Sequence, residues 1–275
     1  MLSLLSQVES IAKEVGHHIL LPAFISQTSI QTRKSDGSIV TETDEKAQAF
    51  IQEALQKLDP NIGFLGEEMS EVEQLKALHD GGKFWCVDPL DGTGNFTTPM
   101  PLFAVSIALI KDGKPVLACI YDPVRDEMFA AVQGSGFRIN QQPYTPIPID
   151  KPLGDCIGFV DFKRLKPALA TKLATQKHYR SQRNIGTCAL EWAWLAAGRS
   201  QFILHGGQKL WDYAAGLLLA EEANCVATDF CGIHPFAKSR LSCPILAASN
   251  TPLHQTWLYL VDESNEYSTL ADRET

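Results

Sequence analysis

The sequence predicts a layered protein that mixes helices and strands, of the α/β or α+β class. Two segments within the first sixty residues place apolar residues at helical spacing, which predicts amphipathic helices. Short apolar runs typical of strands follow, and in the second half of the chain strands and helices alternate. The sequence contains no internal repeat and no low-complexity tract. Its 275 residues suffice for one large domain or for two compact halves.

The first predicted helix has an apolar stripe that runs from Leu4 to Ile19. We expect it to end near Pro22, because proline cannot continue the helical hydrogen-bond pattern. The polar run 34–38 contains an Asp-Gly pair, which predicts a hairpin. Residues 44–58 predict the second helix, again with one apolar face.

Strands are predicted where short apolar runs are bounded by turn residues. The run at 62–65 ends in Gly66-Glu67-Glu68, and the run at 83–87 leads directly into Asp88. Further strands are predicted at 103–110, 115–121 and 127–132.

The Pro-rich segment 142–152 is predicted to cross between two halves of the molecule. We expect an N-terminal α+β half (residues 1–145) and a C-terminal α/β half (residues 146–275). Within the second half, apolar spacing predicts helices at 187–198 and 212–224.

The chain is acidic, with a net charge of −8 and a pI of about 5.4. An acidic surface repels nucleic acid and anionic membranes, so neither is an expected partner. A site for a phosphate compound would need its own positive field, and metal ions are its obvious source.

Seven cysteines, none in a Cys-x-x-Cys pair, argue against a zinc or disulfide framework. We expect most of them to be small buried residues in a reducing cytoplasm. Near the N-terminus, Glu9, Lys13 and Glu14 interrupt the apolar core that a signal peptide requires, and the longest apolar stretches fall short of a membrane span. These features predict a cytoplasmic protein.

The segment Asp88-Pro-Leu-Asp91 carries the strongest chemical signal, since two carboxylates follow an apolar strand at a spacing of three residues. Pro89 stiffens the turn, so both carboxylates and the Leu90 carbonyl can face one point. Hard oxygen donors of this kind suit Mg²⁺ or Mn²⁺ rather than zinc. The following Gly92-Thr93-Gly94 can bring backbone N–H groups close to an anion. The alternative for this motif alone is a turn with solvated acids.

Two other acidic positions are ambiguous in isolation. Glu67 and Glu68 follow a predicted strand, yet paired glutamates after a glycine are usually a solvated helix start. Asp212 opens a predicted helix, where an ordinary N-cap is the simpler interpretation. Sequence spacing alone cannot show that Asp212 meets Asp91.

Four blocks together make the chain resemble the inositol monophosphatases from about residue 5 to 260. In order, they are Val40-Thr-Glu-Thr-Asp44, Gly66-Glu67-Glu68, Asp88-Pro-Leu-Asp-Gly-Thr-Gly-Asn-Phe96 and Trp211-Asp-Tyr-Ala-Ala-Gly216. The third block is highly specific, and the first two are specific only in company. The resemblance implies a layered sandwich of alternating helices and sheets, as in inositol monophosphatase and fructose-1,6-bisphosphatase. Because dimers are common in the family, it also implies a homodimer.

The resemblance further implies roles for individual residues. Two or three Mg²⁺ ions, or Mn²⁺, would be held by Glu67, Asp88, the Leu90 carbonyl, Asp91 and Asp212. Asp44 would orient Thr93, and Thr93 and Glu67 would position and deprotonate a water on the metal. Backbone groups of Gly92 and Thr93 would hold the phosphate, with Asp91 and Asp212 also facing the substrate. The alcohol part would contact Arg183, Gly186, Thr187 and Cys188, and Lys34 would lie on a hairpin over the site. Inhibition by lithium is a further expectation.

These features predict a Mg²⁺-dependent phosphatase that hydrolyses a small phosphate monoester, with inositol 1-phosphate or a related sugar or polyol phosphate as the first choice. Asn95-Phe96 resembles the inositol branch more than the nucleotide branch. The alternatives are a 3′(2′),5′-bisphosphate nucleotidase, a fructose-1,6-bisphosphatase-type enzyme, a metal-dependent binding module, and a regulatory interaction protein that retains the fold.

His205 departs from the family pattern, which often places there a glutamate that holds inositol hydroxyls. Imidazole offers a different set of hydrogen bonds from a carboxylate. We therefore expect inositol 1-phosphate to be accepted but not to be the best substrate, since a second anionic group would suit His205 and Arg183. A plain structural role is the alternative for His205.

Overall fold

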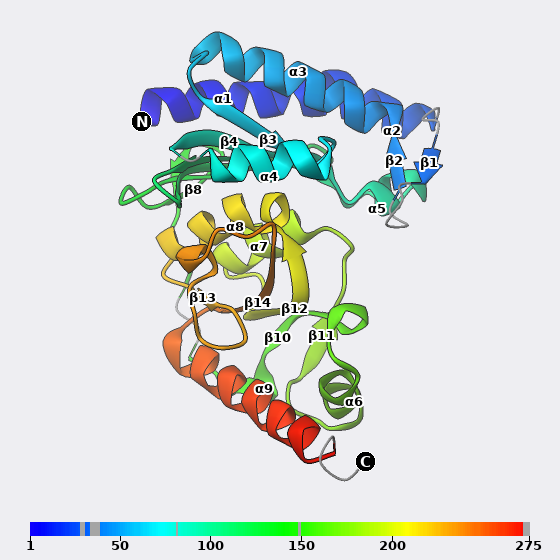
Figure 1. The fold of residues 1–275 in the computed structure, drawn as a ribbon, viewed down its shortest axis with the longest axis vertical. Coiled ribbons are helices and arrows are strands. Elements are labelled where there is room, and N and C mark those ends of the chain that lie inside the picture. The colour runs from blue at the N-terminus through cyan, green and yellow to red at the C-terminus, as the bar shows by residue number, and fades with distance from the viewer. Residues whose placement is uncertain (28–30, 34–38, 81, 148–149, 272–275) are drawn as a thin grey trace.

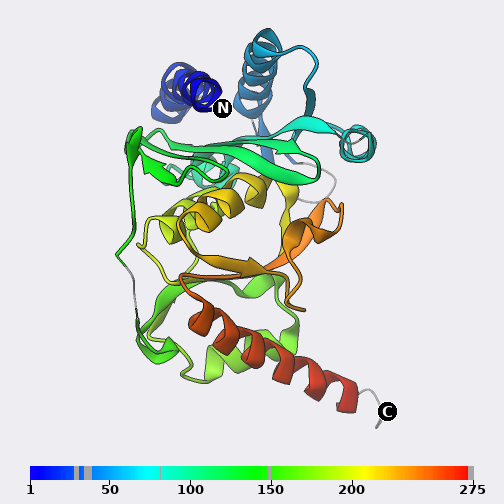
Figure 2. The ribbon, with the colours of Figure 1, turned by 90° about the vertical axis from the view of Figure 1, so that its left-hand side faces the viewer.

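The computed structural model describes residues 1–27, 31–33, 39–80, 82–147 and 150–271. Two sheets and three sets of helices stack in the order helix, sheet, helix, sheet, helix (Figures 1 and 2). The predicted sandwich of alternating layers is therefore confirmed. The buried apolar residues form three clusters. One lies between the first helices and the larger sheet, one surrounds the central helices and reaches both sheets, and one lies between the smaller sheet and the last helices.

The first outer layer contains α1 (Leu2–Val15), the π-helical turn η1 (Gly16–Leu20), α2 (Leu21–Ser26) and α3 (Glu42–Leu58). The prediction that the first helix ends near Pro22 is wrong. The wide turn, in which the Leu21 N–H bonds to the Gly16 carbonyl, precedes the proline, and Pro22 lies in the first turn of α2, where its missing N–H is tolerated. Only glycine fits at position 16, because a Cβ there would lie 2.5 Å from the Tyr121 ring.

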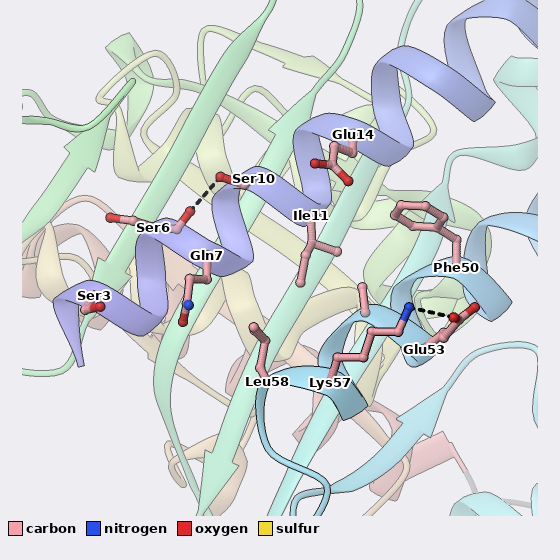
Figure 3. A pocket seen from close by; sticks show the side chains of 11 residues that line it. Ser3, Ser6, Gln7, Ser10, Ile11, Glu14, Phe50, Glu53, Lys57 and Leu58 are labelled. Carbon is pink, nitrogen blue, oxygen red and sulfur yellow. Dashed lines mark hydrogen bonds and ion pairs between the residues drawn. The ribbon is translucent and has the colours of Figure 1, made fainter.

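The helices α1 and α3 lie side by side on the sheet and leave a shallow groove between them (Figure 3). Several of its polar groups bond within their own helix. The Ser10 hydroxyl donates to the Ser6 carbonyl at 2.9 Å, and Lys57 pairs with Glu53 at 2.7 Å. The groove is thus a solvated seam between two amphipathic helices.

The larger sheet has seven strands in sequence order, and only its first pair, β3 with β4, is parallel. The helix α4 (Glu71–His79) connects that pair. The strands are β3 (Gly63–Gly66), β4 (Lys83–Asp91), β5 (Ala104–Lys111), β6 (Lys114–Asp122), β7 (Glu127–Val132), β8 (Phe137–Ile139) and β9 (Gln142–Pro143).

A separate antiparallel pair, β1 (Gln31–Arg33) and β2 (Ile39–Thr41), confirms the predicted hairpin. Its turn at 34–38, including Lys34, lies outside the described residues.

The central layer consists of α7 (Cys188–Ala196) and α8 (Leu210–Glu222), whose buried residues contact both sheets. The smaller sheet has the order β11-β10-β12-β14-β13. Its strands are β10 (Ile157–Asp161), β11 (Ser181–Arg183), β12 (Phe202–Lys209), β13 (Val226–Thr228) and β14 (Ser242–Ala248). The last layer contains α6 (Pro167–Thr175) and α9 (Thr251–Ala271), and short 3₁₀ turns lie at η2 (Leu153–Asp155), η3 (Phe162–Arg164) and η4 (Pro235–Ala237).

Two boundaries differ from the sequence prediction at chemically important places. The strand β4 does not stop at residue 87 but continues through Asp91, with a shift of register between Asp88 and Asp91. This bulge accommodates Pro89, which has no N–H to give to a neighbouring strand. Similarly, α8 begins at Leu210, so Asp212 lies in its first turn and is not the N-cap.

The segment after β9 leads from the larger sheet to the smaller one, as expected for a crossing (Figure 2). The division into halves at residues 145 and 146 stays a prediction. Since α7 and α8 pack against both sheets, much of the core belongs to both halves.

Candidate active site

Three aspartates converge where β4 meets the start of α8. Asp88, Asp91 and Asp212 each place one carboxylate oxygen within 4.8 Å of the other two. The bulge in β4 allows its two aspartates to reach one point, and the Ser106 hydroxyl on β5 donates to the Trp211 carbonyl at 3.3 Å, which fixes the start of α8 beside the sheet. Residues far apart in sequence thereby form one acidic cluster.

Asp91 is held in place by the start of α7. Its Oδ2 accepts hydrogen bonds from the Thr187 hydroxyl and from the Ala189 N–H, the latter at 2.6 Å. The first N–H groups of a helix have no partner within it, so a carboxylate is well placed there. With Oδ2 occupied, Oδ1 remains for a ligand.

The cluster is electrostatically unfavourable without a cation. Burial and the charges of Glu67, Asp91 and Asp212 hold the pKa of the Asp88 carboxyl well above its usual range. Burial raises the pKa of Asp91 to about 6, although the hydrogen bonds from Thr187 and Ala189 lower it. For Asp212, burial and the charges of Asp91 and Glu67 likewise raise the pKa. Groups that repel each other in this way are stabilised by a shared cation.

Glu67 follows β3 directly, where its N–H donates to the Val87 carbonyl of β4 at 3.1 Å. Its side chain is half-buried, and its charge raises the pKa of Asp44, Asp88, Asp91 and Asp212. Glu67 therefore borders the three aspartates, although it lies outside their 4.8 Å group.

Thr93 and Asp44 form the second part of the site. The Thr93 hydroxyl lies 3.0 Å from Asp44 Oδ1 and 3.1 Å from the Leu90 carbonyl oxygen. The other Asp44 oxygen accepts from the Thr41 N–H at 2.8 Å and from the Thr41 hydroxyl at 2.5 Å. Asp44, at 1% exposure, is thus held by Thr41 through one carboxylate oxygen and orients the Thr93 hydroxyl through the other.

The turn after Asp91 leads into the short helix α5 (Thr93–Thr97). Gly92 has φ = 96°, and a Cβ there would lie 2.9 Å from the Leu102 carbonyl oxygen, so glycine is required. The first hydrogen bond of the turn runs from the Phe96 N–H to the Gly92 carbonyl, at 3.0 Å. The N–H groups of residues 93–95 precede it and suit an anion.

Asn95 connects this turn to the loop before α7. Its Nδ2 donates to the Leu102 carbonyl at 2.8 Å and to the Ile185 carbonyl at 2.7 Å. A Cβ at Gly186 would lie 2.9 Å from Asn95 Oδ1. The two loops that surround Asp91 are therefore locked together, a function of Asn95 that the sequence did not indicate.

Only some of the residues expected to contact the alcohol part of a substrate lie beside the aspartates. The hydroxyl of Thr187, which is buried, already donates to Asp91, so only its backbone remains for a substrate. Cys188 is partly exposed at the first position of α7. The burial of its thiol, and to a smaller extent the charges of Asp212 and Asp91, raise the pKa of that thiol. Arg183 lies at the sheet edge and donates to Ser181 Oγ at 2.6 Å, and within the described residues it forms no hydrogen bond or ion pair with the aspartates.

His205 is 6% exposed on β12. Its Nδ1 accepts from the Gly207 N–H at 3.1 Å, and its Nε2 lies 3.5 Å from Asp161 Oδ2, directly opposite on β10. Burial would raise the pKa of Asp161, but the hydrogen bonds and charges of His205 and Lys163 together lower it.

Sequence reasoning missed two acids near the site. Asp161 carries the carboxylate that faces His205, and its charge raises the pKa of Cys188 and of Glu191. Glu191, on α7, is 6% exposed, and burial raises its pKa to about 8. Neither belongs to an acidic motif, and only the apolar setting of Glu191 within Ala-Leu-Glu-Trp could have drawn attention to it.

The family of the protein follows from comparison of its whole length with known proteins. Residues 2–265 match the profile of the inositol monophosphatase family. The chain belongs to the inositol monophosphatase family. Members are phosphoric monoester hydrolases, and the chain is an enzyme of that class.

Curated members of the inositol monophosphatase family differ in what their names record. The inositol-1-monophosphatase of Rhizobium meliloti is 36% identical over 71% of this chain and 74% of its own. The Nus factor SuhB of Vibrio cholerae is 32% identical over 80% of this chain and 83% of its own.

Among solved structures of the family, the staphylococcal inositol monophosphatase II has been determined with two ligands. With inositol monophosphate it matches at a TM-score of 0.78 and 25% identity, covering 98% of this chain and 100% of its own. With 2′-AMP it matches at 0.79 and 27% identity, covering 100% of both chains. Both likenesses extend over both sheets.

The described residues fit a hard divalent cation. Three aspartate oxygens lie within 4.8 Å of one another, and burial together with the neighbouring carboxylate charges raises the pKa of all three groups. Oxygen-only donors favour Mg²⁺ or Mn²⁺ over zinc. The cysteines of the described chain are free, and five of the seven are buried. No helix in the described ranges is long and apolar enough to cross a membrane.

Proposed function

We propose that the chain is a Mg²⁺-dependent phosphatase that hydrolyses a small phosphate monoester, with inositol 1-phosphate or a related sugar or polyol phosphate as substrate. The convergence of Asp88, Asp91 and Asp212 beside the Thr93–Asp44 pair is the observation that supports it. Glu67 and the Leu90 carbonyl complete the set of oxygens for two or three ions, which could also be Mn²⁺. We also expect a homodimer, which light scattering of the purified chain can test, and a cytoplasmic location.

Bound Mg²⁺ would act as a Lewis acid and stabilise the negative charge that develops on the phosphoryl and leaving oxygens. The chain itself positions the reactants. The Thr93 hydroxyl donates its hydrogen bond to Asp44, so its oxygen can accept a hydrogen bond from the attacking water. Glu67 accepts one proton of that water as the new P–O bond forms, and the other proton stays on the oxygen that joins the phosphate. The N–H groups of residues 92 and 93 bind the phosphate oxygens as the bond to the alcohol breaks, and the leaving alkoxide oxygen takes a proton from a solvent water.

A phosphate-release assay tests this function directly. Inositol 1-phosphate, fructose 1,6-bisphosphate and adenosine 3′,5′-bisphosphate are each incubated with the protein and Mg²⁺, with an EDTA-treated sample as control. We expect Mg²⁺-dependent release, inhibited by Li⁺. Full activity after chelation, or no release from any monoester, would contradict the proposal.

The resemblance to SuhB proteins named as Nus factors supports a second candidate, a regulatory role in addition to or in place of turnover. The intact acidic cluster favours the enzyme, because an interaction protein has no need to keep mutually repelling carboxylates. If no monoester is hydrolysed with either Mg²⁺ or Mn²⁺ while the fold is intact, the regulatory role becomes the better interpretation.

The substitution Thr93→Val tests the role of the hydroxyl. We expect kcat to fall about 10²-fold with little change in KM, because the hydroxyl orients the attacking water and does not bind the substrate. Thr97→Val is the matched control: the Thr97 hydroxyl, one turn along the same short helix, lies 3.0 Å from the Thr93 carbonyl oxygen and 3.1 Å from that of Gly94, and it contacts neither Asp44 nor Leu90 among the described residues. Equal losses in the two variants would show that the effect is structural.

Specificity can be tested at the His205–Asp161 pair. A glutamate at 205 would face Asp161 across neighbouring strands, so His205→Glu is combined with Asp161→Asn to avoid two opposed carboxylates. We expect the double variant to raise kcat/KM for inositol 1-phosphate relative to fructose 1,6-bisphosphate by about tenfold. Asp161→Asn alone is the control. An unchanged ratio would mean that His205 serves only to bind Asp161 and Gly207.

A further inference from the structure

A small pocket beside α1 contains a buried carboxylate that the proposed function does not use. It has a volume of about 350 Å³ and lies between α1 and the edge formed by β7, β8 and their turns. Its lining residues are Glu9, Ser10, Lys13, Asp126, Met128, Asn140 and Gln141.

Glu9 lies on the face of α1 that packs on the sheet, among Val8, Ile11 and Ala12, and is only 4% exposed. Its Oε1 is buried and has no hydrogen-bond partner among the residues that the structure describes. An ionised oxygen without a partner is costly to bury, so the site lacks a donor. Burial raises the pKa of Glu9, and the charge of Arg138 lowers it in part.

The cationic groups nearby are engaged elsewhere. Lys13 Nζ lies 2.8 Å from Asp126 Oδ1, and the same oxygen accepts the Tyr121 hydroxyl at 2.8 Å. The Arg138 guanidinium donates to the Gln141 carbonyl. Neither of these contacts supplies a donor to Glu9 Oε1.

A hydrogen-bond donor, the side-chain amide of Asn140, also lines the pocket. Asn140 Oδ1 accepts the Met128 N–H at 2.7 Å, which leaves the Nδ2 of this residue as a donor. Within the described part of the chain, the pocket therefore combines an unpaired acceptor, Glu9, with an exposed donor, the Nδ2 of Asn140. Its volume exceeds that of a single ion and suits a few non-hydrogen atoms.

We propose that this pocket binds a small organic ammonium compound, whose N–H groups donate to Glu9 and whose hydroxyl or other acceptor contacts Asn140. The ammonium supplies the donor that Glu9 lacks, and charge-assisted hydrogen bonds of this kind are short and strong. A bare monovalent cation would leave Asn140 without a partner, and a quaternary ammonium has no N–H to donate.

Calorimetric titration and melting temperatures at pH 7 test the proposal with three probes at equal ionic strength: ethanolammonium chloride, tetramethylammonium chloride and potassium chloride. We expect ethanolammonium alone to bind and to raise the melting temperature of the full chain. Glu9→Gln, which keeps the shape of the side chain, is expected to weaken this binding at least about tenfold. Glu14→Gln, an exposed position on the same helix, is expected to leave it unchanged.

Equal effects of the three salts, no binding of ethanolammonium, or unchanged affinity in Glu9→Gln would each overturn the proposal. The comparison of salts uses the unaltered protein, so it decides the question even if the variant folds poorly. Phosphate release plays no part in either measurement, so the result is independent of the proposed phosphatase activity.

Discussion

Replacing Asp91 by asparagine is expected to lower kcat/KM for the best phosphate monoester by about 10³-fold or more, with the fold intact. The asparagine Oδ1 can still accept the hydrogen bonds from Thr187 and Ala189 that hold position 91 at the start of α7. The charge that attracts a divalent cation, however, is lost. Steady-state phosphate release and circular dichroism measure the two parts of this expectation.

Asp122→Asn is the matched control, because Asp122 is a fully buried carboxylate of the same sheet outside the cluster. It pairs with Arg125 at 2.9 Å and accepts the Val124 N–H at 3.0 Å. This variant is expected to lose about 1–3 kcal/mol of unfolding free energy and to keep its activity. If Asp91→Asn retains activity, or if both variants lose it equally, the acidic cluster is not the catalytic centre.

The metal-free protein is expected to lose stability as the pH rises from 5 to 9, in contrast to the usual behaviour of paired carboxylates. In the folded state the pKa of Asp91 is raised to about 6 and that of Glu191 to about 8, and those of Asp88 and Asp212 are also raised. The folded chain then binds more protons than the unfolded one. The associated stability is fully present below the unfolded pKa values, near 4, and disappears as the pH passes through the folded values.

The size of this effect is substantial. A shift from the ordinary value of 3.8 to about 6 at Asp91 alone corresponds to about 3 kcal/mol. We expect the melting temperature of the EDTA-treated protein to fall by roughly 5–10 °C between pH 5 and pH 8. Scanning calorimetry across this range measures it.

Magnesium should remove most of this loss, because it binds the ionised cluster of the folded state and not the unfolded chain. At a concentration 100 times its dissociation constant it would add about 2.7 kcal/mol. Asp91→Asn should flatten the pH dependence near 6, and Glu191→Gln the part near 8. Metal-free stability that rises steadily from pH 5 to 9 would refute the electrostatic description of the site.

Local sequence patterns predicted most of the secondary structure and the chemical nature of the site. The strands at 127–132 and the helix ending at Leu58 were placed correctly, because apolar spacing reports which face of an element is buried. The end of the first helix was misplaced, since a local proline signal could not anticipate a π-turn beneath Tyr121. The bulge in β4 was also missed, because it depends on pairing with β5 and not on the local sequence.

The sequence by itself therefore determined the layered fold class, the oxygen-rich character of the motif at 88–91 and the family resemblance, all of which depend on residues close together in the chain. Only the tertiary structure decided that Asp212 reaches Asp88 and Asp91, that Thr187 is committed to Asp91, and that His205 faces Asp161. These contacts join residues separated by tens to more than a hundred positions. Their geometry is set by how α7, α8 and the two sheets pack, and local spacing carries no information on that packing.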